Sequence, residues 1–134
     1  MKDRGFTLIE VMMAVAIFAG ALVAFAGFYL TTARLAESSR NMTQAMNDAR
    51  TILETIRDTA QSGGLTGGTG VTGVFPAGTP IAAPTGVPWS LTSETLSASY
   101  SSPAADPLPV TVLVSWTEWG RARTALVDTM VTRR

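Results

Sequence analysis

A single carboxylate interrupts the most apolar part of this sequence. Glu10 is the one charged side chain between Arg4 and Arg34, and residues 11–33 carry no charge at all. An ionised acid at the start of a membrane helix is costly unless a cation offsets it. No basic side chain lies one helical turn beyond Glu10, so we expect it to pair with a cation from elsewhere. The alternative is that Glu10 sits at headgroup level beside Lys2 and Arg4.

Few other residues offer site chemistry. The chain has neither His nor Cys, which removes the commonest general base, the commonest metal ligand and any disulfide. The Gly-rich stretch at residues 61–73 lacks the Lys of a phosphate-binding loop. Ten basic residues against ten acidic ones give zero formal charge, unlike a nucleic-acid binder. We therefore expect no enzyme, no cofactor, no metal and no nucleic-acid partner.

The 134 residues suffice for one ordinary domain preceded by a membrane segment. Residues 11–33 would span roughly 35 Å as a helix, enough for the hydrocarbon core of a bilayer. Lys2 and Arg4 favour a cytoplasmic N-terminus. The predicted regions are a leader at residues 1–5, an apolar helix at 6–33, an amphipathic helix at 34–60 and a loop-rich β domain at 61–134.

The helical pattern continues beyond the apolar segment. Between residues 34 and 60 a narrow apolar seam repeats at intervals of three and four, which predicts one long helix from residue 6 to residue 60. Gly63 and Gly64 should end it. The seam is expected to pack on a sheet rather than form a free coiled coil. Its members are Leu35, Ser39, Met42, Met46, Ala49, Leu53, Ile56 and Ala60.

The remainder is predicted to be a loop followed by β structure. Residues 61–88 hold eight Gly, four Pro and no charge, and read as a loop with short strand-like pieces such as residues 71–75. Alternating apolar residues then predict strands around 96–100 and 110–116, with a return strand at 123–132. The turn is expected at residues 118–121, and Pro107 and Pro109 should lie in the loop before this hairpin.

Three tryptophans and two arginines are further candidates in the β region. Trp89, Trp116 and Trp119 could form a ligand platform, but packing of the hairpin is the favoured interpretation, since Trp116 continues the apolar face. Arg121 and Arg123 fall on one face of the return strand. They are either solvated or able to meet an acidic partner.

The N-terminal residues resemble a known processing signal. The string Gly5-Phe6-Thr7-Leu8-Ile9-Glu10 after a short basic leader resembles the class III signal of type IV pilins and type II secretion pseudopilins. The resemblance implies cleavage after Gly5 by a prepilin peptidase and N-methylation of Phe6. It also implies that Glu10 pairs with the Phe6 amine of a neighbouring subunit during assembly.

Departures from the family pattern indicate which kind of pilin subunit to expect. Major pilins carry a Pro within the membrane helix and a C-terminal disulfide, and both are missing here. Gly20 and Gly27 are the only helix-weakening residues in the apolar run, serving either close helix packing or local flexibility. The closing stretch at residues 114–124 is similar to the terminal hairpin of type IV pilus modification proteins and of minor pseudopilin I. These features favour a minor subunit.

The sequence therefore predicts an α+β, pilin-like fold: a long N-terminal helix packed on a small C-terminal antiparallel sheet. The expected partners are other pilins or pseudopilins, prepilin peptidase, membrane lipid and an assembly platform. The expected location is the inner membrane, single-pass with a periplasmic head, and then a pilus or pseudopilus. Two alternatives stay open: an adhesive module using loop 61–88 and a membrane-anchored periplasmic domain without a filament role. A secreted protein cleaved near Ala24-Phe25-Ala26 is disfavoured, because Glu10 would fall inside the apolar part of its signal and the helical pattern continues past Ala26.

Overall fold

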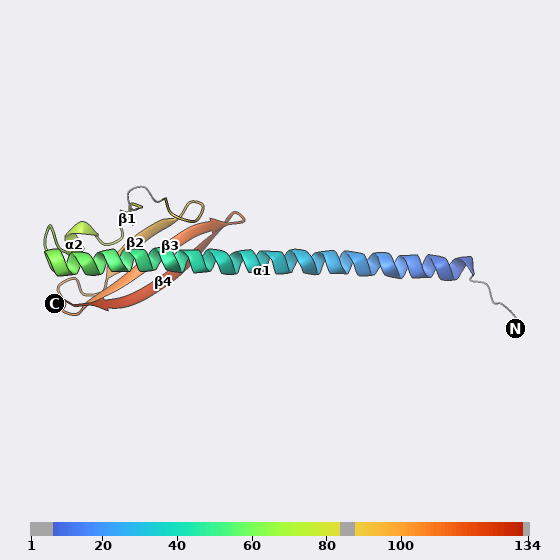
Figure 1. Ribbon diagram of the computed structural model, residues 1–134, viewed down its shortest axis with the longest axis horizontal. Coiled ribbons are helices and arrows are strands. Elements are labelled where there is room, and N and C mark those ends of the chain that lie inside the picture. Colours follow the sequence, from blue (N-terminus) through green and yellow to red (C-terminus); the bar gives the residue numbers. More distant parts are fainter. Residues whose placement is uncertain (1–6, 84–87, 133–134) are drawn as a thin grey trace. The chain divides into compact units, whose positions relative to one another are not determined.

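A computed structural model describes residues 7–83 and 88–132. Its first element is α1, the 56-residue helix Leu8–Gly63 (Figure 1). The helix ends at Gly63, and Gly64 follows in the left-handed conformation at φ +84°, which only glycine adopts without strain. The predicted helix and its stop at Gly63-Gly64 are thus confirmed over the described residues, with the end three residues later than residue 60.

The chain divides into two compact units, Met1–Ser38 and Ser39–Arg134. The described part of the first unit is helix alone beyond its first residue. Every side chain from residue 7 to residue 37 is exposed, including the large apolar ones. This unit therefore has no core of its own.

The second unit contains a four-stranded antiparallel sheet in the order β1-β2-β3-β4. Its strands are β1 (Pro80–Ile81), β2 (Thr95–Tyr100), β3 (Leu108–Glu118) and β4 (Arg121–Val131). Strands that follow one another in sequence are neighbours in space, and Val112 of β3 pairs with Val127 of β4. The predicted α+β fold, with a long helix and a small antiparallel sheet, is confirmed.

The core of the second unit lies between one face of α1 and one face of the sheet. Buried residues alternate along β3, as the sequence pattern predicts. From the helix, Ile56 is fully buried, and Leu96 and Val112 are fully buried from the sheet. The largest fully buried side chains are Ile56, Leu96, Leu108, Val71, Val110, Val112 and Val114.

The helix contributes a broader and shorter stripe to the core than the predicted seam. Met46 and the four seam residues after it pack into the core, as predicted. Leu35, Ser39 and Met42 are exposed, so the prediction is wrong for the first three members of the seam. Ala45 and Ile52, which the seam omitted, are buried. A strict 3.5-residue repeat describes a coiled-coil seam, whereas a helix lying on a sheet buries a broader stripe at its natural 3.6-residue period.

Residues 61–83 are more ordered than a plain loop. The strand-like interpretation of residues 71–75 is wrong, because Val71–Val74 forms the short helix α2 and the Phe75 amide donates to the Val71 carbonyl at 2.9 Å. Valine is common in strands, but β propensity depends strongly on packing context. Here Val71 is fully buried within the short helix. A Cβ on Gly73 would lie 2.1 Å from the Gly67 carbonyl oxygen, so this close backbone approach requires glycine.

The β3–β4 hairpin follows the prediction with two corrections. Its turn has Trp119 at φ +48° and Gly120 at φ +73°, the pattern of a type I′ turn. The return strand begins at Arg121 rather than residue 123. Pro109 lies within β3 and not in the preceding loop. It fits there because β2 ends opposite Val110, so Pro109 is paired only with β4.

Candidate functional site

The start of α1 is fixed by Thr7. The Glu10 amide donates to the Thr7 carbonyl at 3.1 Å and to its Oγ1 at 3.4 Å, which makes Thr7 the N-cap of the helix. Thr7 and Glu10 have the spacing of a capping box, and an acid in the first turn complements the helix dipole. The sequence analysis missed this local role, although the Thr-x-x-Glu pattern signals it.

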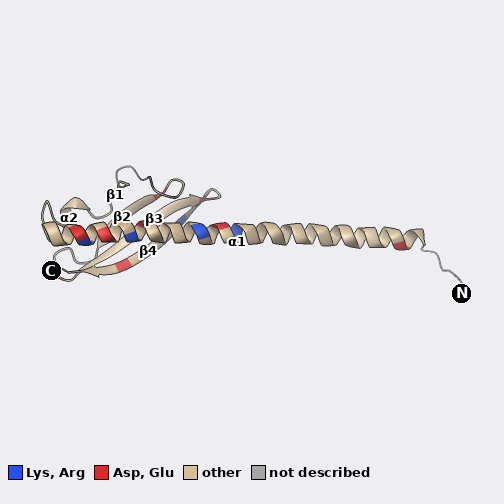
Figure 2. Ribbon diagram, in the orientation of Figure 1, with Lys and Arg blue, Asp and Glu red and all other residues tan. Residues whose placement is uncertain are grey.

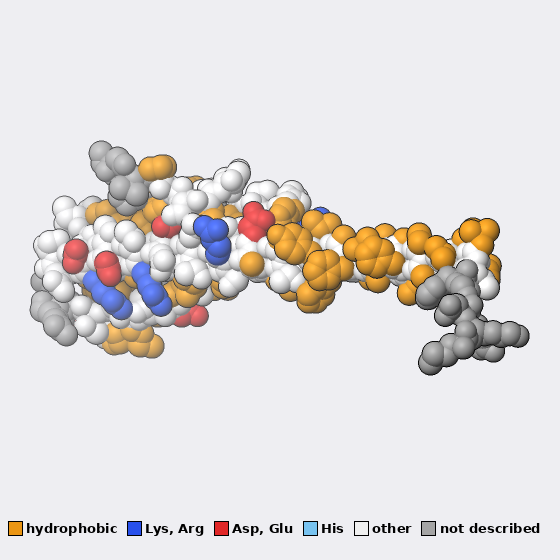
Figure 3. Space-filling view, turned by 45° about the vertical axis from the view of Figure 1, so that its right-hand side comes forward, with side chains coloured by type: hydrophobic (Ala, Val, Ile, Leu, Met, Phe, Trp, Pro, Cys, Tyr) orange, Lys and Arg blue, Asp and Glu red, His pale blue; other side chains and the backbone are white. Residues whose placement is uncertain are grey.

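Between residues 11 and 33 the helix exposes its large apolar side chains, and Figure 3 shows them gathered on the face in view. Ile17 is 70% exposed and Phe28 71% exposed. Soluble proteins rarely expose contiguous apolar patches of this extent. By length and composition, α1 is able to cross a membrane. Its N-terminal half therefore needs lipid or other helices as its surroundings.

Glu10 lies within this apolar surface. Val11, Ala14 and Phe18 lie beside it on the helix, and none of them offers a hydrogen-bond donor from its side chain. In the part of the chain that the structure describes, the one ion pair joins Arg123 to Glu118. Glu10 is therefore not paired with a cation from the described residues.

Gly20 and Gly27 serve no packing within the described chain. A Cβ built on either residue meets no atom within 4 Å. Seven residues apart, they lie on nearly the same side of the helix. The hydroxyls of Thr31 and Thr32, one turn further on, donate to the carbonyls of Gly27 and Phe28 at 3.0 and 2.9 Å. Both hydroxyls are therefore satisfied without water, as an apolar medium requires.

The structure does not bring all the predicted site residues together. Gly5 and Phe6, the expected cleavage site, lie outside the described residues. Glu10 is in the first turn of α1, while Gly20 and Gly27 lie some three and five turns further along. They lie along one helix rather than around a pocket, with Glu10 roughly a quarter turn around the helix from the two glycines. This arrangement suits contact with neighbouring helices better than binding of a small ligand.

A buried polar cluster in the second unit was not foreseen. The Glu118 side chain is 2% exposed and accepts from Asn41 Nδ2 at 2.9 Å and from Arg123 Nε at 3.2 Å. Arg123 is thus not simply solvated, because its Nε is paired with Glu118 within the chain. The cluster ties the hairpin to α1. A Glu before the turn and two Arg after it would have signalled an ion pair, although not that Arg123 rather than Arg121 makes it. The Asn41 contact depends on the tertiary fold.

A second acid is buried where α1 meets the segment before β2. Glu94 accepts a hydrogen bond from the Leu91 amide at 2.9 Å, and Asp48 accepts from the Ser90 amide and hydroxyl at 3.3 Å. Burial raises the pKa of Glu94, the Leu91 amide opposes this, and the nearby Asp48 adds to the rise. Figure 2 shows how the charged residues concentrate in the C-terminal half of α1 and in the strands beside it.

The tryptophans do not form a platform. Trp116 is buried in the core on the face of Val112 and Val114, which confirms the packing interpretation. Trp89 is half-buried against the same core. Trp119, in contrast, is 50% exposed in the turn. A left-handed conformation costs a bulky residue on the order of 1–2 kcal/mol, so nothing local favours Trp at that position.

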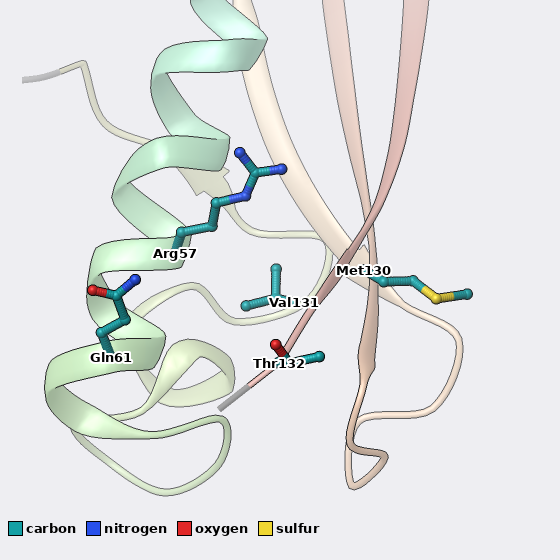
Figure 4. Close-up of a pocket in the computed structure, with 5 residues that line it drawn as sticks. All are labelled: Arg57, Gln61, Met130, Val131 and Thr132. Carbon is teal, nitrogen blue, oxygen red and sulfur yellow. The ribbon is translucent and has the colours of Figure 1, made fainter. Parts of the chain in front are cut away.

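One hollow lies between the end of α1 and the end of β4, with a volume of about 350 Å³. Arg57 and Gln61 line it from the helix, and Val131 and Thr132 line it from the strand (Figure 4). The Arg57 guanidinium donates to Thr129 Oγ1 at 3.4 Å. The polar side chains that line it, Arg57, Gln61 and Thr132, are all exposed. The hollow is therefore a shallow surface feature rather than an enclosed binding site.

Comparison with known proteins adds evidence for the N-terminal segment. Residues 1–26 match the family model described as the prokaryotic N-terminal methylation motif. This match supports the type IV pilin and pseudopilin family, as the resemblance of residues 5–10 predicted. The motif points to a structural subunit rather than an enzyme. No match was found among curated proteins or among solved structures.

Proposed function

We propose that this protein is a minor pilin, a structural subunit that initiates or modifies a type IV pilus. The observation that carries the proposal is the exposed apolar helix of residues 8–33, joined to the methylation motif at residues 1–26. A helix with no intrachain packing is suited to assembly side by side with other such helices. A minor pseudopilin of a type II secretion system has the same requirements and is the second candidate.

In this proposal the leader at residues 1–5 is removed by prepilin peptidase, and Phe6 becomes the methylated N-terminus. The new α-amino group supplies the cation that Glu10 lacks within the described chain. Pairing between Glu10 of one subunit and the amine of its neighbour would offset the cost of both charges in an apolar surrounding. Gly20 and Gly27 would let neighbouring helices approach closely or let the helix unwind locally.

Before assembly, the protein would be a single-pass inner-membrane protein. Lys2 and Arg4 favour a cytoplasmic N-terminus, which leaves the second unit in the periplasm. Afterwards the helix would leave the bilayer for the filament core, driven by an assembly platform and its ATPase. A filament role distinguishes this proposal from a plain membrane-anchored domain, and residues 61–83 would add adhesion only as a separate property of the head.

The decisive experiment is the mass and N-terminal sequence of the membrane-extracted protein, expressed with and without a prepilin peptidase. We expect a chain beginning at methylated Phe6 only when the peptidase is present. A chain beginning at Met1 in both cases would leave a simple membrane anchor, and a start at Gly27 would indicate secretion. Gly5→Leu is the control variant that should block cleavage without changing the apolar helix.

Assembly needs its own readout in a host that makes the filament. Glu10→Gln removes the charge and keeps the shape, so we expect normal processing but loss of the subunit from sheared filaments. Glu37→Gln, an exposed acid beyond the apolar segment, is the matched control and should assemble normally. Equal incorporation of both variants would contradict the pairing role of Glu10.

A further inference from the structure

The two edges of the sheet in the second unit differ in how they are protected. At one edge, β1 has only two residues, Pro80 and Ile81, and proline lacks the N–H that a further strand would need. At the other edge, β4 runs for eleven residues, contains no proline and pairs with β3 without interruption (Figure 1). A long edge without such protection is a template for pairing with another chain. The unprotected edge of this sheet is therefore that of β4.

The hairpin register decides which backbone groups of β4 point away from the sheet. Glu118 and Arg121 close a two-residue turn, so they exchange both hydrogen bonds, and every second pair after them does the same. The β4 residues between these pairs direct their N–H and C=O groups outward. They are Ala122, Thr124, Leu126, Asp128 and Met130, and all five are exposed. Backbone hydrogen bonds from the described loops and helices do not reach these outward groups.

The side chains along this edge define the kind of strand that fits it. Leu126 is 64% exposed and Met130 69% exposed, and both lie on the sheet face that points away from the core. Leu126 is opposite Leu113 of β3, so the apolar surface continues from the edge onto the sheet. Asp128, between them, accepts from Thr111 Oγ1 at 2.6 Å, which holds this carboxylate over the sheet rather than beyond its edge. A partner strand with apolar side chains on this face would cover Leu126 and Met130.

Charge favours another protein as the source of that strand. Arg121, at the start of β4, is exposed and forms no ion pair with any described residue. Two β4 strands would pair antiparallel through their outward residues, which are even-numbered, so Arg121 would face an odd-numbered residue of the second copy. Those positions hold Arg, Ala, Val and Thr, because the one acid of β4, Asp128, is even-numbered. A strand with an acid opposite Arg121 therefore has a different sequence from β4.

We propose that the β4 edge binds an extended segment of another protein, which adds a strand antiparallel to β4. The outward N–H and C=O groups of β4 hold the segment through its main chain. Its side chains supply specificity, because apolar residues contact Leu126 and Met130 and an acid pairs with Arg121. Antiparallel addition continues the arrangement of every strand pair in this sheet. The edge belongs wholly to the second unit, so the inference goes beyond a filament role and does not depend on it.

Photocrosslinking of the full-length protein in its native host tests the strand addition. The crosslinker p-benzoylphenylalanine stands in place of Ala122 or Met130, at the two ends of the outward row. The control places it at Thr79, which is exposed beside β1 at the opposite edge. We expect both β4 positions to crosslink to one segment of one partner, at residues about eight apart and in reverse order. The Thr79 position should not crosslink to that segment.

A proline in the outward row tests the main-chain contact. Thr124→Pro removes one outward N–H and no bond to β3, so the melting temperature of the head in detergent micelles should stay close to that of Thr124→Ala. Crosslinking from position 130 should fall about 2- to 10-fold in Thr124→Pro, the effect of one hydrogen bond, and should not fall in Thr124→Ala. Arg121→Ser should also reduce crosslinking, whereas Arg50→Ser, on the exposed side of α1, should not.

Several results would overturn the proposal. One is the absence of crosslinks from both β4 positions, or crosslinks to segments with no common order. Another is a crosslinked product of two copies of this chain, since the occupant would then be a second copy. Equal crosslinking in Thr124→Pro and Thr124→Ala, with both folded, would mean that the contact does not use the main chain of β4. If Thr124→Pro lowers the melting temperature, equal crosslinking in Arg121→Ser and Arg50→Ser overturns the proposal instead.

Discussion

The two units of this chain solve the problem of apolar surface in opposite ways. In residues 8–37 every side chain is exposed, and the segment relies on lipid or other subunits to cover it. In the head, α1 and the sheet cover one another, and Ile56 and Val112 are fully buried. The comparison shows that one continuous helix can leave its apolar surface exposed in one half and bury it against a sheet in the other.

Their acids differ in the same way. Glu118 in the head is buried and is satisfied by Asn41 and Arg123 of its own chain. Glu10 has only the helix dipole and its N-terminal turn nearby among the described residues. The first acid is paired within its own chain, whereas we propose that the second pairs with the amine of a neighbouring subunit. Three predictions test how the two units differ.

The largest expected effect is on the core. Ile56→Ala should lower the free energy of unfolding of the head by about 2–5 kcal/mol, because it removes a fully buried side chain and leaves a cavity. Ile17→Ala makes the same chemical change at a 70% exposed position and should alter it by less than about 0.5 kcal/mol. Denaturation of the intact chain in detergent micelles, followed by tryptophan fluorescence, measures both. Similar losses would mean that the two halves of α1 fold as one unit.

The converse change tests the apolar half. Leu22→Arg places a charge near the middle of the uncharged segment and should raise the cost of membrane insertion by about 2.5–3.5 kcal/mol. The stability of the head should not change. The measurement is the fraction that resists alkaline extraction from membranes, with Leu22→Phe as the control that keeps the segment apolar. Normal insertion of Leu22→Arg would contradict the membrane role of this half.

A smaller effect concerns Glu94, the second buried acid of the head. The pKa of Glu94 is raised above 4.5 in the folded protein, so its protonated form is favoured by folding. The stability it contributes is fully present below the unfolded pKa and is lost as the pH rises through the folded pKa. Glu94→Gln should therefore stabilise the head relative to the unaltered protein at neutral pH, and the difference should shrink toward about pH 4.

Unfolding of both proteins in micelles across that pH range measures the difference. Glu54→Gln, an exposed acid on α1, is the control and should follow the unaltered protein. A constant offset between Glu94→Gln and the unaltered protein at all pH values would rule out the titration of Glu94 as the cause.

Much of the fold could be predicted because its signals are local. The apolar run, the Gly63-Gly64 stop and the alternation along β3 each follow from neighbouring residues. The errors occurred where burial overrode local preference. Residues 71–75 read as strand-like but form α2, and Leu35 and Met42 fit the seam but are exposed. No local pattern indicates which residues of a helix will be covered by the sheet that packs against it.

The candidate site divides in the same manner. Glu10, Gly20 and Gly27 were identified from the sequence, because each interrupts a run of apolar helix-forming residues. The Thr7 cap was also readable from its spacing to Glu10 and was overlooked. The Asn41–Glu118 contact was not readable, because 77 residues separate its partners.

The sequence by itself determined that this chain has a processing motif, an apolar helix long enough for a membrane and a β-rich head. Hydrophobic length, helix stops and strand alternation are properties of short segments, and they need no knowledge of distant contacts. Only the tertiary structure decided which residues of α1 the sheet buries, that Glu118 pairs with Asn41 and Arg123, and that Trp119 stays exposed. Those outcomes depend on which surfaces meet, and long-range packing determines that.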